Sequence, residues 1–307
     1  MRLARIAIFT DEPGWHGARL RQAFVDQGYA CEYVSLTECR LTTESSELPV
    51  LIPGFEQTLP DAVFVRGVPG GSLEEVVFYL DILHALQALN IPVYNDGRAV
   101  ERSVDKGMTS FLLRAAGLPT PPTWVLRDRA EALAIAESEL RKGHHLVSKP
   151  LFGSQGEGLR RIEKMTDLFW LTSSQGIYYL QRFIESGGQG YCDSRVFVIN
   201  GRVVGAMRRH GNSWLNNVAR GARCEAITAD AALQQLAIAA VACLDMDYAG
   251  VDIIQDRQGA CSIVEVNSIP AWKGLQSVCR IDIAALLATD LVDRHLGGVG
   301  KARVRAS

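Results

Sequence analysis

Two apolar, β-branched segments near the C-terminus, each interrupted by one carboxylate, constrain this chain most. They are residues 249–254, which contain Asp252, and residues 262–267, which contain Glu265. A turn-forming stretch separates them, so the spacing predicts adjacent antiparallel strands with Asp252 roughly opposite Glu265. Asn267 lies two positions beyond Glu265 and therefore points to the same face. Such oxygen-bearing side chains on an apolar sheet favour a Mg²⁺ site shared with phosphates, although a solvent-facing hairpin with two exposed acids fits the same pattern.

The composition is that of an ordinary globular protein, with 48% hydrophobic and 21% charged residues. A length of 307 residues predicts two or three compact units. The net charge of −2 argues against nucleic-acid or anionic-membrane partners. No apolar run approaches the ~20 residues that span a bilayer, and the N-terminus lacks a secretory apolar region. Seven widely spaced cysteines favour a reducing compartment, so we expect a cytoplasmic protein.

The first hundred residues alternate strand and helix patterns, which predicts a parallel α/β sheet covered by helices. We expect strands at residues 6–9, 31–34, 62–65 and 92–94, and a helix from about Gly17. The capping box Ser72-x-x-Glu75 opens another helix, whose buried face should contain Val76, Val77, Leu80 and Leu83. The turn after the first strand lacks the glycine fingerprint of dinucleotide-binding folds, which argues against NAD binding.

The pattern changes from about Ser103. We expect helices at 105–116 and from Asp128, and strands at 123–126, 146–149 and 178–184. Antiparallel signals then dominate, since the segments 195–199 and 203–208 flank the turn sequence Asn200-Gly201. A helix from about Ala229 should bury Leu233, Leu236, Ala237, Ala240, Val241 and Leu244. These changes divide the chain into units at 1–102, 103–185 and 186–297, followed by a flexible tail at 298–307.

A lysine followed directly by a glycine-rich loop is the second chemical feature. Lys149 ends an apolar strand, and Gly153, Gly156 and Gly158 follow it closely. Such a loop can turn backbone N–H groups towards phosphate oxygens because no Cβ blocks their approach. It is not a P-loop, since the Gly-Lys-Ser/Thr ending is absent. A glycine-rich hairpin is also often no more than a tight turn.

Several cations could complete an anion site. Each of them alone is best interpreted as an ordinary surface cation, but they cluster just before the carboxylate strands. A phosphate-rich transition state needs such a cationic clamp beside Mg²⁺. The candidates are Lys106, Arg195 (which alternates with Asp193 along one strand), Arg208, Arg209 and Arg220.

In this order, the motifs resemble the ATP-grasp superfamily, and more closely its RimK-like amino-acid ligases, from about Val104 to Leu296. The motifs are Asp105-Lys106, 147–150, 153–158, 181–184, Asp193-Ser194-Arg195, Asn217-x-x-Arg220-Gly221, 250–252 and Glu265-Val266-Asn267-x-x-Pro270. The resemblance implies an α/β fold, α+β in its catalytic part. An N-terminal parallel α/β pre-ATP-grasp domain would precede the ATP-grasp unit.

The resemblance also implies ATP and two Mg²⁺ ions as cofactors, with Mn²⁺ as a possible substitute and Asp252, Glu265 and Asn267 as metal ligands. The implied catalytic residues, which would contact the γ-phosphate or the activated carboxylate, are Arg195, Arg209, Asn217 and Arg220. The implied nucleotide-binding residues are Lys106, Lys149, Gly153, Ser154, Gln155, Gly156, Gly158, Gln181, Arg182, Phe183, Ile184 and Asp193. One departure is Arg182, which stands at a hinge position where relatives often carry an acid.

The implied reaction has two steps, formation of an acyl phosphate and its displacement by an amine. No side-chain nucleophile is needed, in keeping with the lack of a convincing Ser–His–Asp or Cys–His set. The segments 64–71, 120–124 and 265–276 resemble the tetrahydromethanopterin and methylofuran glutamate ligases of methanogens and methylotrophs. By this resemblance, L-glutamate and a small carboxylate acceptor are the substrates. Lys273 would contact glutamate's carboxylate, Trp272 would be an aromatic platform or a core residue, and Arg66 would contact the acceptor or be structural.

Other functions fit the same residues. A protein-modifying glutamate ligase would share every catalytic residue and differ in the openness of its acceptor cleft. A nucleotide-binding regulatory module without turnover would bind ATP and release no phosphate, and a kinase would stop at a phosphorylated product. We also expect a homo-oligomer.

Overall fold

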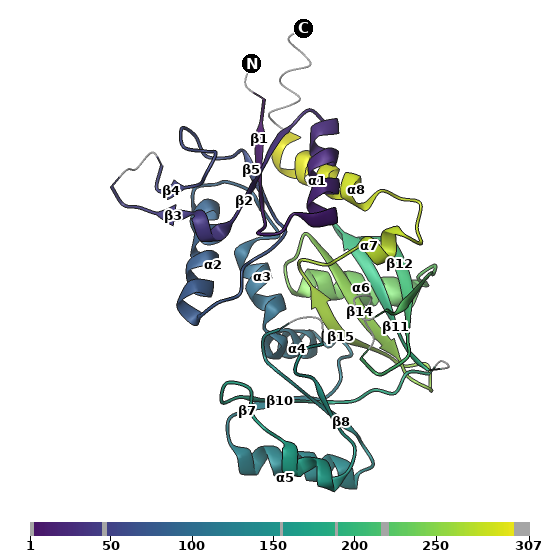
Figure 1. Cartoon of the computed structure of the whole chain (residues 1–307). Coiled ribbons are helices and arrows are strands. Elements are labelled where there is room, and N and C mark those ends of the chain that lie inside the picture. Colours follow the sequence, from purple (N-terminus) through teal and green to yellow (C-terminus); the bar gives the residue numbers. More distant parts are fainter. Residues whose placement is uncertain (1–2, 45–47, 154–155, 188–189, 216–220, 298–307) are drawn as a thin grey trace.

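The structure, a computed structural model, describes residues 3–44, 48–153, 156–187, 190–215 and 221–297. Its strands form three larger sheets and one short pair (Figure 1). The first sheet is parallel throughout, in the order β2-β1-β5-β6, which confirms the expectation from the alternating pattern. The elements of this unit are β1 (Arg5–Phe9), α1 (Gly14–Asp26), β2 (Ala30–Val34), β3 (Arg40–Leu41), β4 (Val50–Leu51), β5 (Ala62–Val65), α2 (Leu73–Ala88) and β6 (Val93–Tyr94).

Two consecutive helices connect the first unit to the second. Helix α3 (Gly97–Val104) runs through the expected boundary at residue 102, and Asp105 then caps α4 (Lys106–Ala115) by accepting a hydrogen bond from the Met108 N–H. The expected boundaries at residues 102, 185 and 297 stay a prediction.

The second unit is an antiparallel sheet in the order β7-β10-β8-β9. With helix α5 it forms the end of the molecule opposite α1 and α8 (Figure 1). The expected strand at 178–184 is two residues shorter in the structure, where β10 ends at Arg182. The elements of this unit are β7 (Thr123–Leu126), α5 (Arg129–Arg141), β8 (Leu146–Lys149), β9 (Arg160–Ile162) and β10 (Tyr178–Arg182).

The third unit is an antiparallel sheet in the order β13-β12-β11-β14-β15. Asn200 and Gly201 both have positive φ in the turn between β11 and β12, which confirms the hairpin expected there. Strands β14 and β15 pair with Asp252 opposite Glu265, as their spacing predicts. The elements are β11 (Tyr191–Ile199), β12 (Arg202–Gly211), β13 (Arg223–Ala226), α6 (Ala231–Cys243), β14 (Tyr248–Gln255), β15 (Cys261–Asn267), α7 (Lys273–Gln276) and α8 (Ile283–Leu291).

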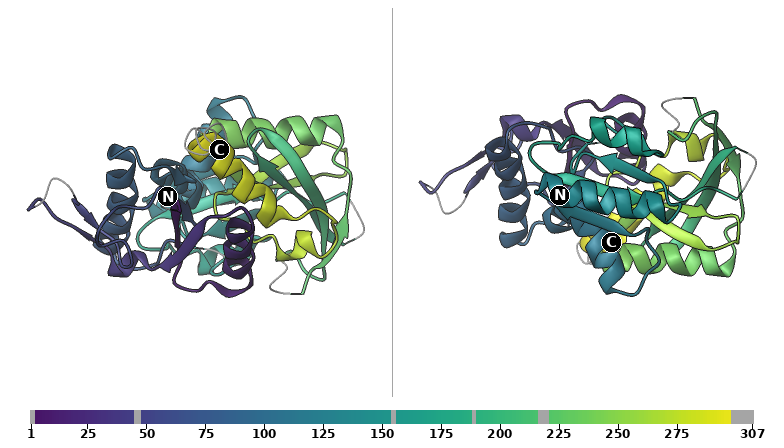
Figure 2. Two further views of the ribbon diagram at one scale, coloured as in Figure 1. Left: turned by 90° about the horizontal axis from the view of Figure 1, so that it is seen from above. Right: turned by 90° about the horizontal axis from the view of Figure 1, so that it is seen from below.

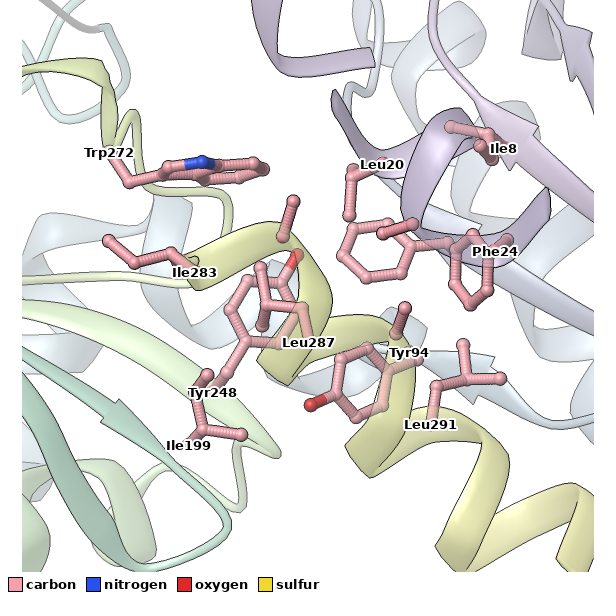
Figure 3. Close-up of a cluster of buried hydrophobic side chains, with 14 of the residues drawn as sticks. Ile8, Leu20, Phe24, Tyr94, Ile199, Tyr248, Trp272, Ile283, Leu287 and Leu291 are labelled. Carbon is pink, nitrogen blue, oxygen red and sulfur yellow. The ribbon is translucent and has the colours of Figure 1, made fainter. Parts of the chain in front are cut away.

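One hydrophobic core joins the first and third units. Helix α8 packs against α1 on one side and β11 on the other (Figure 2). Figure 3 shows its side chains between those of α1 and those of the five-stranded sheet. Burying this much apolar surface fixes the first sheet against the third. Labelled members of the core are Ile8, Leu20, Phe24, Tyr94, Ile199, Tyr248, Trp272, Ile283, Leu287 and Leu291.

Two expectations about the helices need correction, and one helix was missed. Helix α1 begins at Gly14, not at Gly17, because Pro13 already has helical dihedral angles. Val77 is 45% exposed, because it lies about 100° around α2 from Val76, outside the buried face that contains Leu80 and Leu83. Helix α8 was not expected from the sequence.

Of the helices that the structure describes, none combines the length and the apolarity that crossing a bilayer requires.

A buried amide ties the first unit to the third. Asn95 is fully buried, and its Nδ2 donates to the carbonyl oxygens of Tyr248 at 2.7 Å and Ser268 at 2.8 Å. Its Oδ1 accepts from the Asp247 N–H at 2.7 Å and the Tyr248 N–H at 3.3 Å. Asn95 therefore satisfies four backbone groups that no other side chain reaches in the described residues.

Replacement of this amide should destabilise the protein. We expect Asn95→Ala to lower the free energy of unfolding by about 3 kcal/mol, because it leaves buried backbone groups without partners. Urea titration followed by tryptophan fluorescence measures the change. The control is Gln22→Ala on the exposed face of α1, which should change the free energy by less than about 0.5 kcal/mol. Equal effects of the two substitutions would contradict this role of Asn95.

Candidate active site

A cavity of about 690 Å³ is lined by residues of all three units. This volume is in the range of ligand-binding pockets. Of the expected site residues that the structure describes, all but Gly158, Trp272 and the exposed cation Arg208 line it. These residues are Arg66, Lys106, Lys149, Gly153, Gly156, Gln181, Arg182, Phe183, Ile184, Asp193, Arg195, Arg209, Asp252, Glu265, Asn267 and Lys273.

The carboxylate hairpin lies on the wall formed by β14 and β15. Directly beside the Asp252–Glu265 pair the register shifts, so that Val264 is an extra residue on β15. Such bulges are common next to active sites because they change the direction of the neighbouring side chains. Asn267 is anchored through its Nδ2, which donates to the Gly250 carbonyl oxygen at 3.4 Å. That contact leaves its Oδ1 available to a ligand.

Asp252 pairs with two arginines, Arg195 from the adjacent strand β11 and Arg209 from β12, one strand further away. Its two oxygens accept from Nε and Nη2 of Arg195, each at 2.7 Å. Nη2 of Arg209 lies 2.8 Å from Oδ2 of the same carboxylate and also pairs with Asp193. All four groups are largely buried, which a charge tolerates only beside a counter-charge.

The arginines decide the ionisation of Asp252. Burial raises its pKa, but Arg195 and Arg209 outweigh burial and lower the pKa to about 2. Burial raises the pKa of Asp193 against the opposing effect of Arg209, and the Asp252 charge raises it further. Asp252 is therefore ionised at neutral pH and remains a potential metal ligand.

Two lysines face the hairpin from the second unit. Nζ of Lys149 donates to Oε1 of Gln181 at 2.7 Å, and Nζ of Lys106 donates to the Gly153 carbonyl oxygen at 2.6 Å. Burial lowers the pKa of Lys149 to about 8, and the negative charge of Glu265 opposes this shift. Burial also lowers the pKa of Lys106, again opposed by Glu265. Glu265 thus lies between the two ammonium groups and the other metal-ligand candidates.

The glycine-rich loop has the backbone conformation for which glycine is needed. Gly153, Gly156 and Gly158 have φ values of 130°, 74° and 69°. Gly158 does not line the cavity, and a Cβ on it would approach Pro150 within 3.1 Å, so this glycine serves the turn. Ser154 and Gln155 lie outside the described residues, as do Asn217 and Arg220, and their expected roles stay predictions.

The end of β10 offers one backbone donor to a ligand. The Arg182 N–H donates to the Pro122 carbonyl oxygen, and the Phe183 N–H donates to that of His145. The Ile184 N–H has no hydrogen bond within the described residues and lines the cavity. The Arg182 side chain is bound to buried Glu139, with Nε and Nη2 donating to Oε2 at 2.9 and 2.7 Å. A ribose contact from the Arg182 guanidinium would require breaking this pair.

Trp272 needs a correction, because it is not an aromatic platform. The side chain is 1% exposed, belongs to the core shared by the first and third units and does not line the cavity. The other interpretation, core packing, is the correct one. Lys273 and Arg66 do line the cavity, Lys273 from the start of α7 and Arg66 from the loop that follows β5.

Sequence reasoning missed two side chains beside this site. The Tyr179 hydroxyl accepts a hydrogen bond from Nε2 of Gln181 at 3.0 Å and so helps to orient the partner of Lys149. Nε2 of His16 accepts hydrogen bonds from the N–H groups of Trp272 and Lys273. His16 follows the carboxyl end of β1, and ligands of parallel α/β sheets bind at such ends. This position in the sequence is the signal by which His16 could have been predicted as a site residue.

The donor set fits a hard divalent cation. The carboxylate of Glu265 has no hydrogen bond or ion pair within the described residues, and Oδ1 of Asp252 accepts only one bond there, from Arg195. Together with Oδ1 of Asn267 they supply carboxylate and amide oxygens, which Mg²⁺ prefers.

The comparisons agree with this geometry. Residues 103–291 match the family model of the RimK-like ATP-grasp domain. A tetrahydromethanopterin:alpha-L-glutamate ligase of Methanococcus maripaludis is 33% identical over 76% of this chain and 78% of its own length. The ligase of the same name in Methanosarcina acetivorans is 30% identical over 90% of this chain and 94% of its own. The solved structure of the ATP-grasp ligase PsnB with minimal precursor, Mg and ADP matches with a TM-score of 0.74 at 19% identity, covering 95% of this chain and 98% of its own.

The family match and the curated relatives therefore define an ATP-grasp ligase. More specifically, the chain belongs to the RimK-like ATP-grasp family, whose curated relatives include glutamate ligases.

The lowered pKa of Lys149 predicts a pH-dependent affinity for nucleotide. Above about pH 8 free Lys149 loses its proton, so ATP must bind with proton uptake and its affinity should fall about tenfold from pH 7 to pH 9. Calorimetry in buffers of different ionisation enthalpy measures both effects. The control is Lys149→Arg, which keeps its charge and should show neither effect. Equal pH dependence in both proteins would contradict the assignment.

Glu265 is predicted to mediate the effect of magnesium on nucleotide binding. Mg²⁺ should increase the ATP affinity of the wild-type protein, and we expect this increase to be about tenfold smaller in Glu265→Gln. The reason is that an amide is a weaker cation ligand than a carboxylate. Titration with ATP in the presence and absence of Mg²⁺ separates this effect from a loss of folding. Glu74→Gln, on the exposed first turn of α2, is the matched control. If Glu265→Gln retains the full magnesium effect, Glu265 is not a metal ligand.

Proposed function

We propose that this enzyme joins L-glutamate in amide linkage to the carboxylate of a one-carbon carrier cofactor of the tetrahydromethanopterin or methylofuran type. The observation that carries this proposal is the similarity, over most of both chains, to two tetrahydromethanopterin:alpha-L-glutamate ligases. The cavity supports it, because the nucleotide-binding candidates and the cations Arg66 and Lys273 line the same space.

In this proposal, the second unit holds the nucleotide. Lys106 and Lys149 bind its phosphates, and the loop around Gly153 and Gly156 covers them. Gln181 keeps the Lys149 ammonium group in position through their 2.7 Å hydrogen bond. The Ile184 N–H donates to the adenine ring. These groups orient the γ-phosphate towards the third unit, so that positioning and not a side-chain nucleophile lowers the barrier.

The arginines of the third unit act on the reacting carboxylate. An oxygen of the acceptor carboxylate attacks the γ-phosphorus, and ADP leaves. The amine of glutamate then attacks the carbonyl carbon of the acyl phosphate, and phosphate leaves while the amine loses a proton. Arg195 uses only Nε and Nη2 to bind Asp252, so its Nη1 can stabilise the developing negative charge.

Asp252, Glu265 and Asn267 would hold Mg²⁺, for which we propose two ions. Bound Mg²⁺ supplies positive charge that offsets the negative charge on the transferred phosphoryl group. In this arrangement Arg195 and Arg209 keep Asp252 ionised and fix its orientation towards the cavity.

Mass spectrometry of the reaction products tests the proposal. The full chain is incubated with ATP, Mg²⁺, L-glutamate and tetrahydromethanopterin or methylofuran. We expect a cofactor product heavier by one glutamyl residue, together with one ADP and one phosphate per amide. Glu265→Gln should reduce turnover about a hundredfold or more, as expected for loss of an essential metal ligand.

Other outcomes would favour the other functions. A glutamyl addition to peptides and not to either cofactor would indicate a protein-modifying ligase. Phosphorylated acceptor without amide would indicate a kinase. Nucleotide binding without release of phosphate under any condition would indicate a regulatory module.

A further inference from the structure

The first unit contributes one side chain to the cavity wall. Among the described residues, Arg66 is the only member of the first hundred residues that lines the cavity. It follows β5, at the carboxyl end of a parallel strand. Lys273 lines the same cavity from the start of α7, in the segment that follows β15.

Arg66 is a partly buried cation without a carboxylate partner in the described part of the chain. Its Nη1 donates to the Ile269 carbonyl oxygen at 3.4 Å, and its guanidinium lies 5.2 Å from the centre of the Trp272 ring. Its Nε is buried and has no hydrogen-bond partner, and no carboxylate of the described residues pairs with it. Burial of an unpaired charge is unfavourable, so the residue is suited to an anionic ligand.

A second buried donor lies in the same stack. Nε1 of Trp272 also lacks a hydrogen-bond partner within the described residues, although the side chain is 1% exposed. Buried N–H groups are nearly always paired in folded proteins. Of these two orphan donors only Arg66 belongs to the cavity wall, so an acceptor in the cavity would meet Arg66 and not Trp272.

His16 fixes the segment that carries Lys273. Its Nε2 accepts from the N–H groups of Trp272 at 3.2 Å and Lys273 at 3.3 Å, so its proton must be on Nδ1 and the ring is neutral. Trp15 and Trp272 pack edge-on against it. Burial lowers the pKa of His16 to about 4, and the charges of Arg66 and Lys273 add to this effect. Both cations thus lie near one imidazole that does not neutralise them.

We infer that Arg66 and Lys273 form one subsite for a substrate carboxylate that does not react, and that His16 is the positioning residue of this subsite. The sequence suggested separate ligands for the two cations, whereas the structure brings them to the same histidine. The inference rests on the proposed function in one respect, because the carboxylate would belong either to glutamate or to the acceptor cofactor. Both substrates are acids, and substitution experiments separate them.

Steady-state kinetics of Arg66→Met and Lys273→Gln identify which substrate binds. We expect the KM of one acidic substrate to rise about tenfold or more with a smaller change in kcat, because a charge-assisted contact is lost in the ground state and the transition state alike. The KM of ATP should not change. A rise for glutamate assigns the subsite to the amine substrate, and a rise for tetrahydromethanopterin assigns it to the acceptor. Unchanged KM values for both would overturn the inference.

A binding experiment tests the subsite without turnover. Glutarate should raise the Tm of the full-length wild-type protein, and glutaramide, its uncharged analogue, should not. Arg66→Met should abolish the glutarate effect. Without ligand its Tm should equal or exceed that of the wild type, because an unpaired buried charge is removed while the side-chain stem still packs. A lower Tm with an unchanged glutarate effect would show that Arg66 is structural. Failure to form an amide, by contrast, would refute only the proposed function.

Two substitutions of His16 test positioning. His16→Phe keeps an aromatic ring but removes the acceptor, and it should raise the same KM as Lys273→Gln. His16→Gln retains an oxygen acceptor and should restore part of the loss. If the two variants have the same KM as the wild type, His16 does not position the subsite.

Discussion

Burying a charge in a protein is costly without a counter-charge, and this cost organises the cavity. Asp252 is held between Arg195 and Arg209, and Arg209 also pairs with Asp193. Lys149 is partly buried, and the negative charge of Glu265 opposes the effect of burial on its pKa. These arrangements place carboxylates and two ammonium groups around one cavity, which suits a nucleotide with bound metal. The arrangement of charged side chains around the cavity thus depends on charge balance as well as on the strands that carry these side chains.

The core shared by the first and third units gives the cavity its third wall. Helix α8 and Trp272 are buried together with α1 and the first sheet, so the loop after β5 is fixed against the segment before α7 (Figure 3). Asn95 adds hydrogen bonds at the same junction. The core contacts are apolar, and the hydrogen bonds of Asn95 go to backbone groups. These interactions therefore hold Arg66 near His16 without neutralising the charge of Arg66.

The sequence predicted what depends on local signals. Two apolar segments separated by a short turn were sufficient to predict the pairing of Asp252 with Glu265. The order of the motifs was sufficient to predict the family. The arginine partners of Asp252 come from other strands of the sheet, so their pairing depends on sheet order, which no local pattern contains. The bulge at Val264 and the burial of Trp272 likewise depend on tertiary packing. Val77 was misplaced because a run of apolar residues hides which side of a helix faces the core.

The contact between α1 and α8 has a consequence for folding during synthesis. Leu20 and Phe24 are buried against residues such as Leu287, more than two hundred positions later in the chain. The N-terminal sheet therefore emerges from the ribosome well before its covering helix exists, and its apolar face must wait for translation to reach α8. Contacts so distant in sequence slow folding, since a long loop must close before they form.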